Sequence, residues 1–465
     1  MLVEDNEEKE THRLDMLHGS IWNKIPCFAL PVAATAILEQ LFNASDVAVV
    51  GNYTGTQKTI AVAAVGANSS IISLIVNLFI GIALGANVVI ANAIGHGDSE
   101  KVHKAVHTSV TVAVLGGILI ALVGELFAEP ALRILLVPED VFPLALLYLR
   151  IYLLGMPVIL LYNFEAAIFR SVGETRTPLI ALSVSGVLNV MFNLFFVAVL
   201  HMTVNGVAIA TVLSNAVSSM LLYRKLRATN LDIRLEPSKL GIDTQVLKRI
   251  LQIGLPAGIQ SAVFSVSNIV IQSAINSLGT VVMAASSAAF NVEVFTYDIL
   301  NSFSQACTTF VGQNFGAGNL RRCRKVLVLC ITEAMVSLII TVSTVLFFGK
   351  PLLAIFNNDP EVVAIGYIRL LFILPSHFFS MLYESMSGYL RGFGISLVPA
   401  LLTMMGVCGI RIAWIHVVFQ KNATFQTIMT VYPISLGVTA MLMIVAVMFY
   451  RPSCKYAHMQ KIEGK

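Results

Sequence analysis

The stretch RSVGETRTP at residues 170–178 returns in altered form as RGFGISLVP at residues 391–399. Three positions of this element are identical 221 residues later, namely Arg170 and Arg391, Gly173 and Gly394, and Pro178 and Pro399. The same offset relates a second element, with Gly95 and Gly97 matching Gly316 and Gly318. A chain of 465 residues that repeats at half its length is typical of transporters built from two similar halves, provided that it is apolar enough for a membrane.

The composition meets that condition. Hydrophobic residues make up 57% of the chain and charged residues 12%, and the mean hydropathy is +0.81. So few charges cannot cover a water-facing surface, and we expect a lipid bilayer to be the solvent. The apolar runs reach the ~20 residues that a helix needs to cross the membrane, and they lack the strict alternation of barrel strands. The acidic start MLVEDNEEKETHRLD shows no signal peptide.

Twelve apolar segments are predicted to span the membrane. They are expected at residues 25–50, 59–94, 104–128, 143–169, 178–200, 205–225, 250–277, 281–313, 326–348, 361–390, 399–419 and 427–449. The repeat groups them into two six-helix bundles at 25–225 and 250–449, with a polar linker at 226–249 and tails at 1–24 and 450–465. The predicted fold class is an all-α integral membrane protein.

Lys and Arg concentrate in the tails and in the connectors that follow even-numbered spans, such as RKLR at 224–227 and RRCRK at 321–325. By the positive-inside rule, both tails and the linker are predicted to be cytoplasmic. The net charge of +4 is therefore a topological signal, and no basic stripe with interleaved aromatics indicates a nucleic-acid partner. We expect a monomeric, multi-pass protein of the inner (cytoplasmic) membrane, whose partners are the lipid bilayer and small-molecule substrates.

Ionisable side chains at bilayer depth are costly, so each of them is a functional candidate. The first half holds a polar set on three spans, consisting of Glu39, Gln40, Asn43 and Asp46 on the first, Asn189 and Asn193 on the fifth, and Thr211 on the sixth. Asp46, Asn193 and Thr211 lie at similar depths, ~7–11 Å below the outer surface at 1.5 Å per residue. Such a cluster can hold a monovalent cation or take up a proton. Interhelical packing by hydrogen bonds is the alternative.

The second half has its own polar set, which consists of Glu293, Asp298, Glu384 and Arg411. Arg411 lies ~18 Å from the cytoplasmic side, where a bare guanidinium is hard to tolerate. We therefore expect it to pair with Glu293 or, as second choice, with Asp298. The pair either braces the second bundle or takes part in proton or substrate handling.

Three further charged residues, together with Glu384, are expected at the ends of spans, where long side chains can reach water or headgroups. Glu165 and Glu384 are placed near cytoplasmic ends with a mainly structural role, and Arg150 and Arg369 are placed at outer ends as headgroup anchors. Beyond these, the spans show no nucleophile–base pair, no P-loop and no metal-ligand spacing, and the six cysteines form no CxxC motif. We therefore predict no catalytic residues, no metal, no cofactor and no enzymatic activity.

Several motifs in order resemble the multidrug and toxic compound extrusion (MATE) transporters over about residues 20–450. They are LPV with a following Gln and Asp at 30–46, the GxG element after the second span, RSVGETRTP at 170–178, the Asn pair with GVAIAT at 189–211, and VGQNFGAGN at 311–319. The resemblance implies two six-helix bundles related by a pseudo-two-fold axis, a central V-shaped cleft, and efflux of cationic drugs in exchange for protons or sodium ions.

The resemblance also assigns residues. The cation-linked aspartate of the family falls on Asp46, preceded by Gln40 and Asn43, and the supporting positions fall on Asn189 and Thr211. A second acidic position is occupied here by Asn193, and the glutamate that another branch uses on the seventh span is replaced by Phe264. The chain is thus similar to the DNA-damage-inducible F-like branch, with one carboxylate fewer. The coupling ion stays open between proton and sodium.

The sequence therefore predicts a secondary antiporter that exports amphiphilic, cationic compounds. Asp46 would bind the coupling ion, with Asn43, Asn189, Asn193 and Thr211 as support and Glu39, Gln40, Glu293, Asp298 and Arg411 as auxiliary candidates. A flippase or exporter of lipid-linked or natural-product cargo on the same scaffold is the alternative. A membrane-embedded enzyme or a passive channel is a more distant one.

Overall fold

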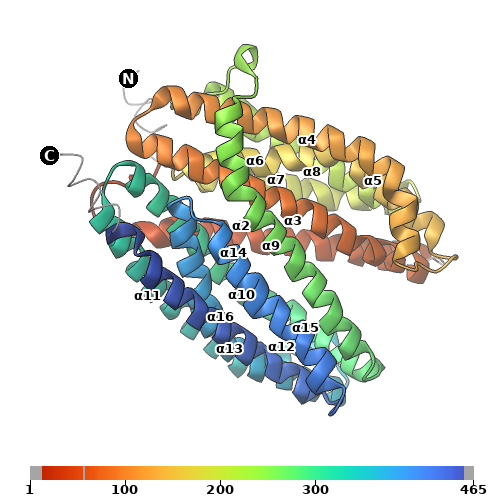
Figure 1. Ribbon diagram of the computed structural model, residues 1–465. Helices are drawn as coiled ribbons and strands as arrows, with labels where there is room; N and C mark the ends of the chain where they lie inside the picture. Colours follow the sequence, from red (N-terminus) through yellow and green to blue (C-terminus); the bar gives the residue numbers. More distant parts are fainter. Residues whose placement is uncertain (1–12, 56–57, 455–465) are drawn as a thin grey trace. The chain divides into compact units, whose positions relative to one another are not determined.

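The computed structural model describes residues 13–55 and 58–454. These residues form helices joined by short connections, and no strand occurs among them (Figure 1). They divide into two compact units. Unit 1 holds residues 13–14 and 34–254, and unit 2 holds residues 15–33 and 255–454. The division falls within two long helices, α2 (Lys24–Tyr53) and α9 (Thr244–Asn276).

The first repeat contains six long helical segments. They are α2, α3 (Lys58–His96), α4 (Ser99–Ile134), the pair α5 (Phe142–Leu154) and α6 (Met156–Ser171), α7 (Arg176–Asn193) continued by the π-helix η3 (Leu194–Val199), and α8 (Val204–Ala228). The α5–α6 pair bends by 50°. Pro157 explains the bend, since it has no N–H to donate to the preceding turn and its ring crowds that turn.

The second repeat follows the same plan. After the short 3-10 helix η4 (Pro237–Lys239), it contains α9, α10 (Thr280–Gly316), α11 (Leu320–Phe347) with the short α12 (Gly349–Phe356), and α13 (Pro360–Gly392). One interrupted span follows, formed by α14 (Leu397–Thr403), η5 (Met404–Gly409), α15 (Ile410–Trp414) and η6 (Ile415–Phe419). The last helix is α16 (Phe425–Tyr450).

In the described part of the chain, ten helical segments are long and apolar enough to cross a membrane, and the bent α5–α6 pair gives an eleventh. The twelfth, α10, has 37 residues and is more polar, because it carries acidic and amide side chains. The predicted all-α fold with twelve spans is confirmed, and the helices cover every predicted span to within one residue. The chain is thus a multi-pass membrane protein.

The repeat seen in the sequence recurs in the backbone. Gly97 and Gly318 have φ of 71° and 73°, and Gly173 and Gly394 have φ of 85° and 80°. Each of these glycines follows a long helix in the left-handed conformation that ends helices and that other residues adopt only with strain. The two halves therefore share not only residues but also the turns that those residues make.

Close packing in unit 1 joins α3 to the first part of α9. A Cβ on Gly85 would collide with the backbone of Ile250 and Gly254, and a Cβ on Gly254 would collide with Gly81 and Ile82. The segment between α8 and α9 joins the same core, because Ile233 and Leu235 are buried there. Its backbone is also held by α4, where His107 Nε2 accepts from the N–H of Glu236 at 3.1 Å.

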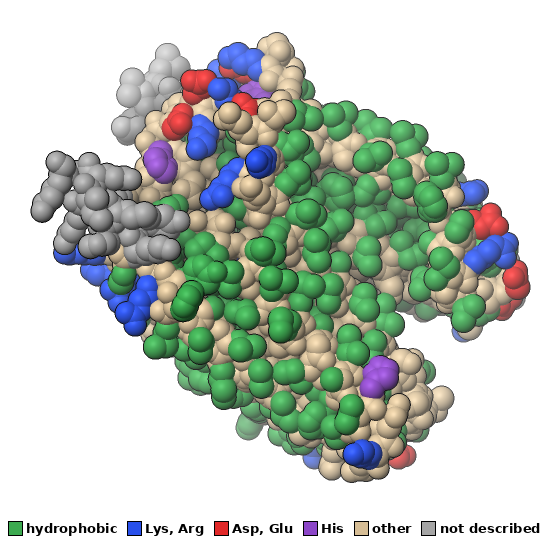
Figure 2. Space-filling view, viewed as in Figure 1, with side chains coloured by type: hydrophobic (Ala, Val, Ile, Leu, Met, Phe, Trp, Pro, Cys, Tyr) green, Lys and Arg blue, Asp and Glu red, His purple; other side chains and the backbone are tan. Residues whose placement is uncertain are grey.

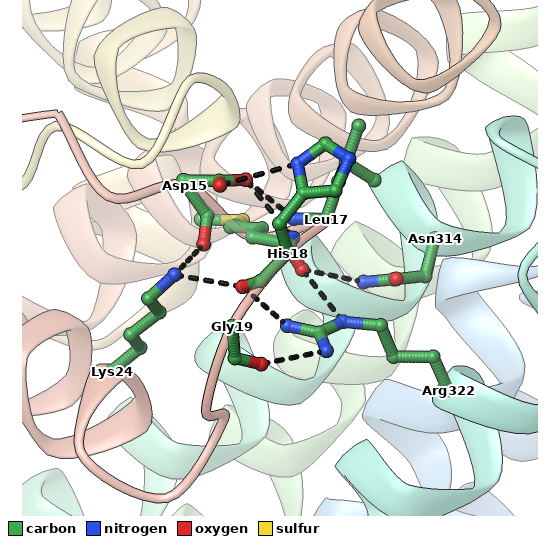
Figure 3. Close-up of polar contacts among 8 residues, drawn as sticks. Asp15, Leu17, His18, Gly19, Lys24, Asn314 and Arg322 are labelled. Carbon is green, nitrogen blue, oxygen red and sulfur yellow. Dashed lines mark hydrogen bonds and ion pairs between the residues drawn. The ribbon is translucent and has the colours of Figure 1, made fainter.

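In unit 2, the segment before α2 is fixed by hydrogen bonds (Figure 3). The Arg322 guanidinium donates to the carbonyl oxygens of Met16, His18 and Gly19 at 3.1, 2.9 and 2.9 Å. Asn314 Nδ2 also donates to the Met16 carbonyl, at 3.0 Å. On the other side of the loop, Lys24 Nζ donates to the carbonyls of Asp15 and His18 at 2.6 and 2.8 Å. We call residues 15–23 the N-terminal loop.

The surface of each unit carries large apolar side chains along its helices (Figure 2). Leu126, Phe127, Ile340, Phe347 and Phe449 are between 62% and 83% exposed. Water would disfavour such a surface, whereas lipid tails solvate it. Charged side chains gather at the helix ends in the same view, as expected for groups that reach the interface.

Candidate functional site

Asp46 lies near the end of α2 and is 5% exposed. Gly186 on α7 brings this helix close, because the ring of Phe42, one turn before Asp46, occupies the space that a Cβ on Gly186 would need. Two turns further along α7, Asn193 then meets Asp46. Val50, one turn after Asp46 on α2, and Val207 on α8 are fully buried.

Both oxygens of the Asp46 carboxylate receive hydrogen bonds from neighbouring helices. Asn193 Nδ2 on α7 donates to Oδ1 at 2.5 Å, and Thr211 Oγ1 on α8 donates to Oδ2 at 3.0 Å. Asn193 Nδ2 also donates to Asn189 Oδ1 at 3.1 Å, and Asn189 Nδ2 lies 3.5 Å from the Thr211 hydroxyl. Four of the predicted residues are thus brought together; we call Asp46, Asn189, Asn193 and Thr211 the Asp46 cluster.

The Thr211 hydroxyl has one proton and two acceptors. It lies 3.0 Å from Asp46 Oδ2 and 3.0 Å from the backbone carbonyl of Val207 one turn earlier. When Asp46 is ionised, Thr211 can donate to it. When Asp46 is protonated, the carboxylic acid can donate to Thr211, which then donates to Val207. The Asp46 carboxyl group therefore has hydrogen-bond partners in both of its protonation states, and no helix has to move between them.

The cluster also presents oxygens that suit a cation. Asn193 is fully buried, and its Oδ1 has no partner among the described residues. Amide oxygen and nitrogen are assigned from the hydrogen-bond network, so turning the Asn193 amide would direct this oxygen at Asp46. Carboxylate, amide and hydroxyl oxygens are the ligands that hard cations prefer. Geometry alone is compatible with a proton or with a small cation.

The remaining predicted residues of α2 point elsewhere. Asn43, Glu39 and Gln40 are exposed, and in the described part of the chain no hydrogen bond joins Asn43 to the Asp46 cluster. Asn43 and Asp46 are three residues apart and lie about 60° apart around the helix, yet Asp46 is buried and Asn43 is exposed. The contact with α7 and α8 is therefore narrow enough to include Asp46 and to leave Asn43 outside it.

Sequence reasoning missed Ser214, whose hydroxyl lies 3.5 Å from Asn189 Nδ2. Its position three residues after Thr211 on α8 was the available signal, since residues at i and i+3 share a helix face. A serine in an apolar helix is common, however, and the pattern alone does not separate it from a packing residue.

In unit 2, the predicted pair of Arg411 with Glu293 is wrong. Glu293 on α10 binds Arg369 on α13, with Arg369 Nε donating to Oε2 at 3.0 Å and Nη2 donating to Oε1. Arg369 is 4% exposed, so its predicted role as a headgroup anchor is also wrong. Depth estimates placed Arg411 and Glu293 at one level but carried no information on which helix faces α10.

Arg150, the other predicted anchor, remains at the surface of unit 1. Its Nε lies 3.4 Å from Glu125 Oε2, and its side chain is 45% exposed. Arg369, which was expected at the corresponding place in the second half, is buried, whereas Arg150 is exposed.

The predicted access of Glu165 and Glu384 to water is wrong as well. Glu165 on α6 is fully buried and accepts from Ser219 Oγ on α8 at 3.0 Å. Glu384 on α13 is 5% exposed and accepts from Tyr297 on α10 at 3.3 Å. Both lie well before the ends of their helices, where neighbouring spans close around them. Asp298 on α10 is half-buried, with Oδ2 unpartnered among the described residues.

Comparison with protein families supports the resemblance. The model of the MatE family matches residues 31–195 and 256–415. A relative from Bacillus subtilis, named as the probable multidrug resistance protein YoeA, is 26% identical over 84% of this chain and 86% of its own length. The probable multidrug resistance protein NorM of Thermotoga maritima is 29% identical over 83% of this chain and 82% of its own.

Two further comparisons extend this result. A protein of Shewanella oneidensis named as an FAD transporter is 24% identical over 66% of this chain and 68% of its own length. A solved structure described as the outward-facing conformation of a multidrug resistance MATE family transporter superposes with a TM-score of 0.87, at 20% identity, over 95% of this chain and 98% of that one. At that identity, the likeness concerns the fold.

Proposed function

The chain belongs to the MatE family of transporters, and from this premise we propose that it is a secondary antiporter that exports amphiphilic, cationic compounds in exchange for protons or sodium ions. Its relatives include multidrug resistance proteins, which makes drug export the function that the similarity supports best. It is a transporter and not an enzyme. We place it in the inner membrane as a monomer, with both termini in the cytoplasm and no cofactor.

The observation that carries the proposal is the Asp46 cluster. Asp46 is the only carboxylate in it, and amides and hydroxyls do not titrate near neutral pH. An antiporter needs a group whose charge or occupancy differs between its two facing states, because a ligand shifts an equilibrium only by its differential affinity. Asp46 is the group in unit 1 that fits this requirement.

The two acceptors of the Thr211 hydroxyl favour a proton as the first choice of coupling ion. Protonation of Asp46 needs only the hydroxyl rotor of Thr211 to turn from Asp46 to Val207. Binding of sodium needs the Asn193 amide to turn as well, since its nitrogen now faces Asp46 at 2.5 Å. One negative charge in place of two also weakens the attraction for a cation.

The test is Asp46→Asn in proteoliposomes, with ethidium as the fluorescent cationic probe and a proton or a sodium gradient imposed separately. The amide is a neutral isostere that mimics the protonated state, so we expect insertion and folding to remain and gradient-driven export to be lost. Asp140→Asn, the same change at an exposed position in unit 1, is the matched control and should export at the wild-type rate.

The proposal is contradicted if Asp46→Asn exports ethidium at the wild-type rate under both gradients. Coupling would then have to reside at another carboxylate within the bundles, either Glu165 in unit 1 or Glu293, Asp298 or Glu384 in unit 2. Asn193→Asp extends the test, because a second carboxylate beside Asp46 should strengthen cation binding and shift coupling toward sodium.

A second cargo class has one specific observation in its favour, which is the relative named as an FAD transporter. Natural-product or lipid-linked cargo on the same scaffold would keep the Asp46 mechanism and change only the substrate. Competition of FAD with ethidium export in the same proteoliposomes separates the two.

A further inference from the structure

Arg411 is a buried cation in unit 2 that the coupling mechanism does not use. It lies on α15, between the π-helical segments η5 and η6, and it is 5% exposed. π-Helical turns inside α-helices are frequent at functional sites, because they displace side chains from the regular helix face. The interrupted span thus directs a guanidinium into the interior of unit 2.

The neighbours of Arg411 are neutral. Its guanidinium lies over the ring of Tyr432, at 4.3 Å from the centroid, and its Nε donates to Ser435 Oγ at 3.3 Å. Both contacts come from α16. Among the described residues, no carboxylate lies within ion-pair distance of Arg411, and the two oxygens of Glu293 are both taken by Arg369.

Most N–H donors of the Arg411 guanidinium therefore lack an acceptor among the described residues. A guanidinium has five N–H donors, and only the one at Nε has a partner among the described residues. Both terminal nitrogens keep a small accessible area, although the residue as a whole is 5% exposed. His377 on α13 is buried, and its Nδ1 has no hydrogen-bond partner among the described residues.

The charge balance points the same way. Arg369 also lies over the Tyr432 ring, at 5.9 Å, so two guanidinium groups share one ring, and of the two it is Arg369 that is paired with Glu293. A buried charge without a counter-ion is unfavourable, and truncating a counter-ion usually destabilises a protein. In the described part of the chain, Arg411 has no carboxylate at ion-pair distance.

We propose that Arg411 is an oxyanion-binding site, which takes the carboxylate of an amphiphilic substrate; cargo that is also cationic would then be zwitterionic. Tyr432 and Ser435 fix the plane of the guanidinium, and the two terminal nitrogens supply parallel N–H donors. This fork matches a carboxylate in a bidentate manner, whereas an ammonium keeps the charge but not the paired geometry. The inference rests on the proposed function in one respect, since it takes unit 2 to be part of the substrate path.

The competing explanation is that Arg411 only braces α15 against α16 through the Tyr432 ring. In that case, no ligand is needed, and the charge is stabilised by the aromatic face and by water. The two explanations differ in a binding experiment, because only an oxyanion site distinguishes a carboxylate from its neutral isostere.

The experiment titrates the purified full chain, in neutral detergent, with dansyl-phenylalanine and with dansyl-phenylalaninamide. The two probes differ only in carboxylate against amide, and a protein-free micelle titration is subtracted. We expect the acid to bind the wild type about tenfold or more tightly than the amide, as charge-assisted bidentate bonds imply. Arg411→Met should reduce this ratio to about one, and Arg411→Lys should give an intermediate ratio.

Arg321→Met is the matched control, because Arg321 is exposed in the same unit and should leave the ratio unchanged. Equal affinity of the wild type for acid and amide overturns the proposal, and so does an unchanged ratio in Arg411→Met. If Arg411→Met does not fold, the acid-to-amide affinity ratios of the wild type and of Arg411→Lys test the proposal. Binding is measured without a gradient, so failure of the coupling role of Asp46 would leave this result unaffected.

Discussion

Glu293 and Arg369 form the buried ion pair on which the interior of unit 2 depends, and they yield a prediction at the scale of single residues. Their side chains are 8% and 4% exposed, and Arg369 also donates to Ser286 on α10. Glu293→Gln removes the counter-ion and leaves a buried guanidinium, so we expect the free energy of unfolding to fall by about 3–5 kcal/mol.

Chemical unfolding in detergent measures this loss. Glu129→Gln is the control, since it breaks an exposed pair with Arg133 at 2.9 Å and should change stability by less than about 1 kcal/mol. The double variant Glu293→Gln with Arg369→Met should recover part of the loss, because no unpaired charge remains. Unfolding of Glu293→Gln at the wild-type denaturant concentration would show that the pair contributes nothing to stability.

The same residues show the limit of sequence reasoning about pairing. Depth along a span follows from counting residues, and on that basis Arg411 and Glu293 were expected to pair. The orientation of each helix about its axis decides the contact, and it depends on the packing of the whole bundle. Asp46, Asn189, Asn193 and Thr211 were expected together and do lie together, because α2, α7 and α8 present those faces to one another.

At the scale of elements, the N-terminal loop shows how a short polar segment is held in place. Burial raises the pKa of the Asp15 carboxyl, but the backbone N–H groups of His18 and Leu17 and the charge of Lys24 outweigh burial and hold it below its usual value. Met16, at 1% exposure, anchors the loop in unit 2. Arg322 supplies the greatest number of hydrogen bonds to the loop.

We therefore predict that Arg322→Met releases the N-terminal loop. Three donors to backbone carbonyls are lost, which should lower the free energy of unfolding by about 1–3 kcal/mol, since each such bond contributes modestly in net terms. Limited trypsin digestion should become several-fold faster at Arg13 and Lys24. Arg324→Met, an exposed arginine two residues later, should digest at the wild-type rate. Equal digestion of both variants would mean that Arg322 does not hold the loop.

Helix bounds could be predicted well, because an apolar run of ~20 or more residues has few alternatives to a spanning helix. The π-helical segments η3, η5 and η6 and the bend at α5–α6 could not be placed from periodicity. They change the direction of side chains by fractions of a turn, and Arg411 owes its orientation to one of them. Ser214, by contrast, lies within the regular helix α8, and it was missed because a serine in an apolar helix is common.

At the scale of the whole molecule, the two repeats agree in helix order and in the glycine turns after the second and fourth spans. They differ in the charge that each buries. In unit 1, the carboxylate of Asp46 lies among amides and hydroxyls, whereas in unit 2 Arg369 is paired with Glu293 and Arg411 contacts Tyr432 and Ser435. Corresponding halves of a duplicated fold thus hold different buried polar groups, which agrees with the proposal that a coupling ion and a substrate are handled separately.

The depth of Asp46 in the membrane depends on the orientation of the whole chain, and this orientation can be tested by labelling. By the positive-inside rule, Lys and Arg in the linker and after α10 predict that these connectors are cytoplasmic and that the opposite connectors are outside. In a cysteine-free background, Lys239→Cys and Arg324→Cys should resist a membrane-impermeant maleimide added to intact cells. Glu139→Cys and Asn422→Cys should react, and all four positions are exposed in the structure.

Permeabilised cells provide the control, since all four variants must then react. Labelling of Lys239→Cys in intact cells would show that the orientation is the inverse of the predicted one. Asp46 would then lie toward the cytoplasmic side, away from the protons of an acidic outside medium.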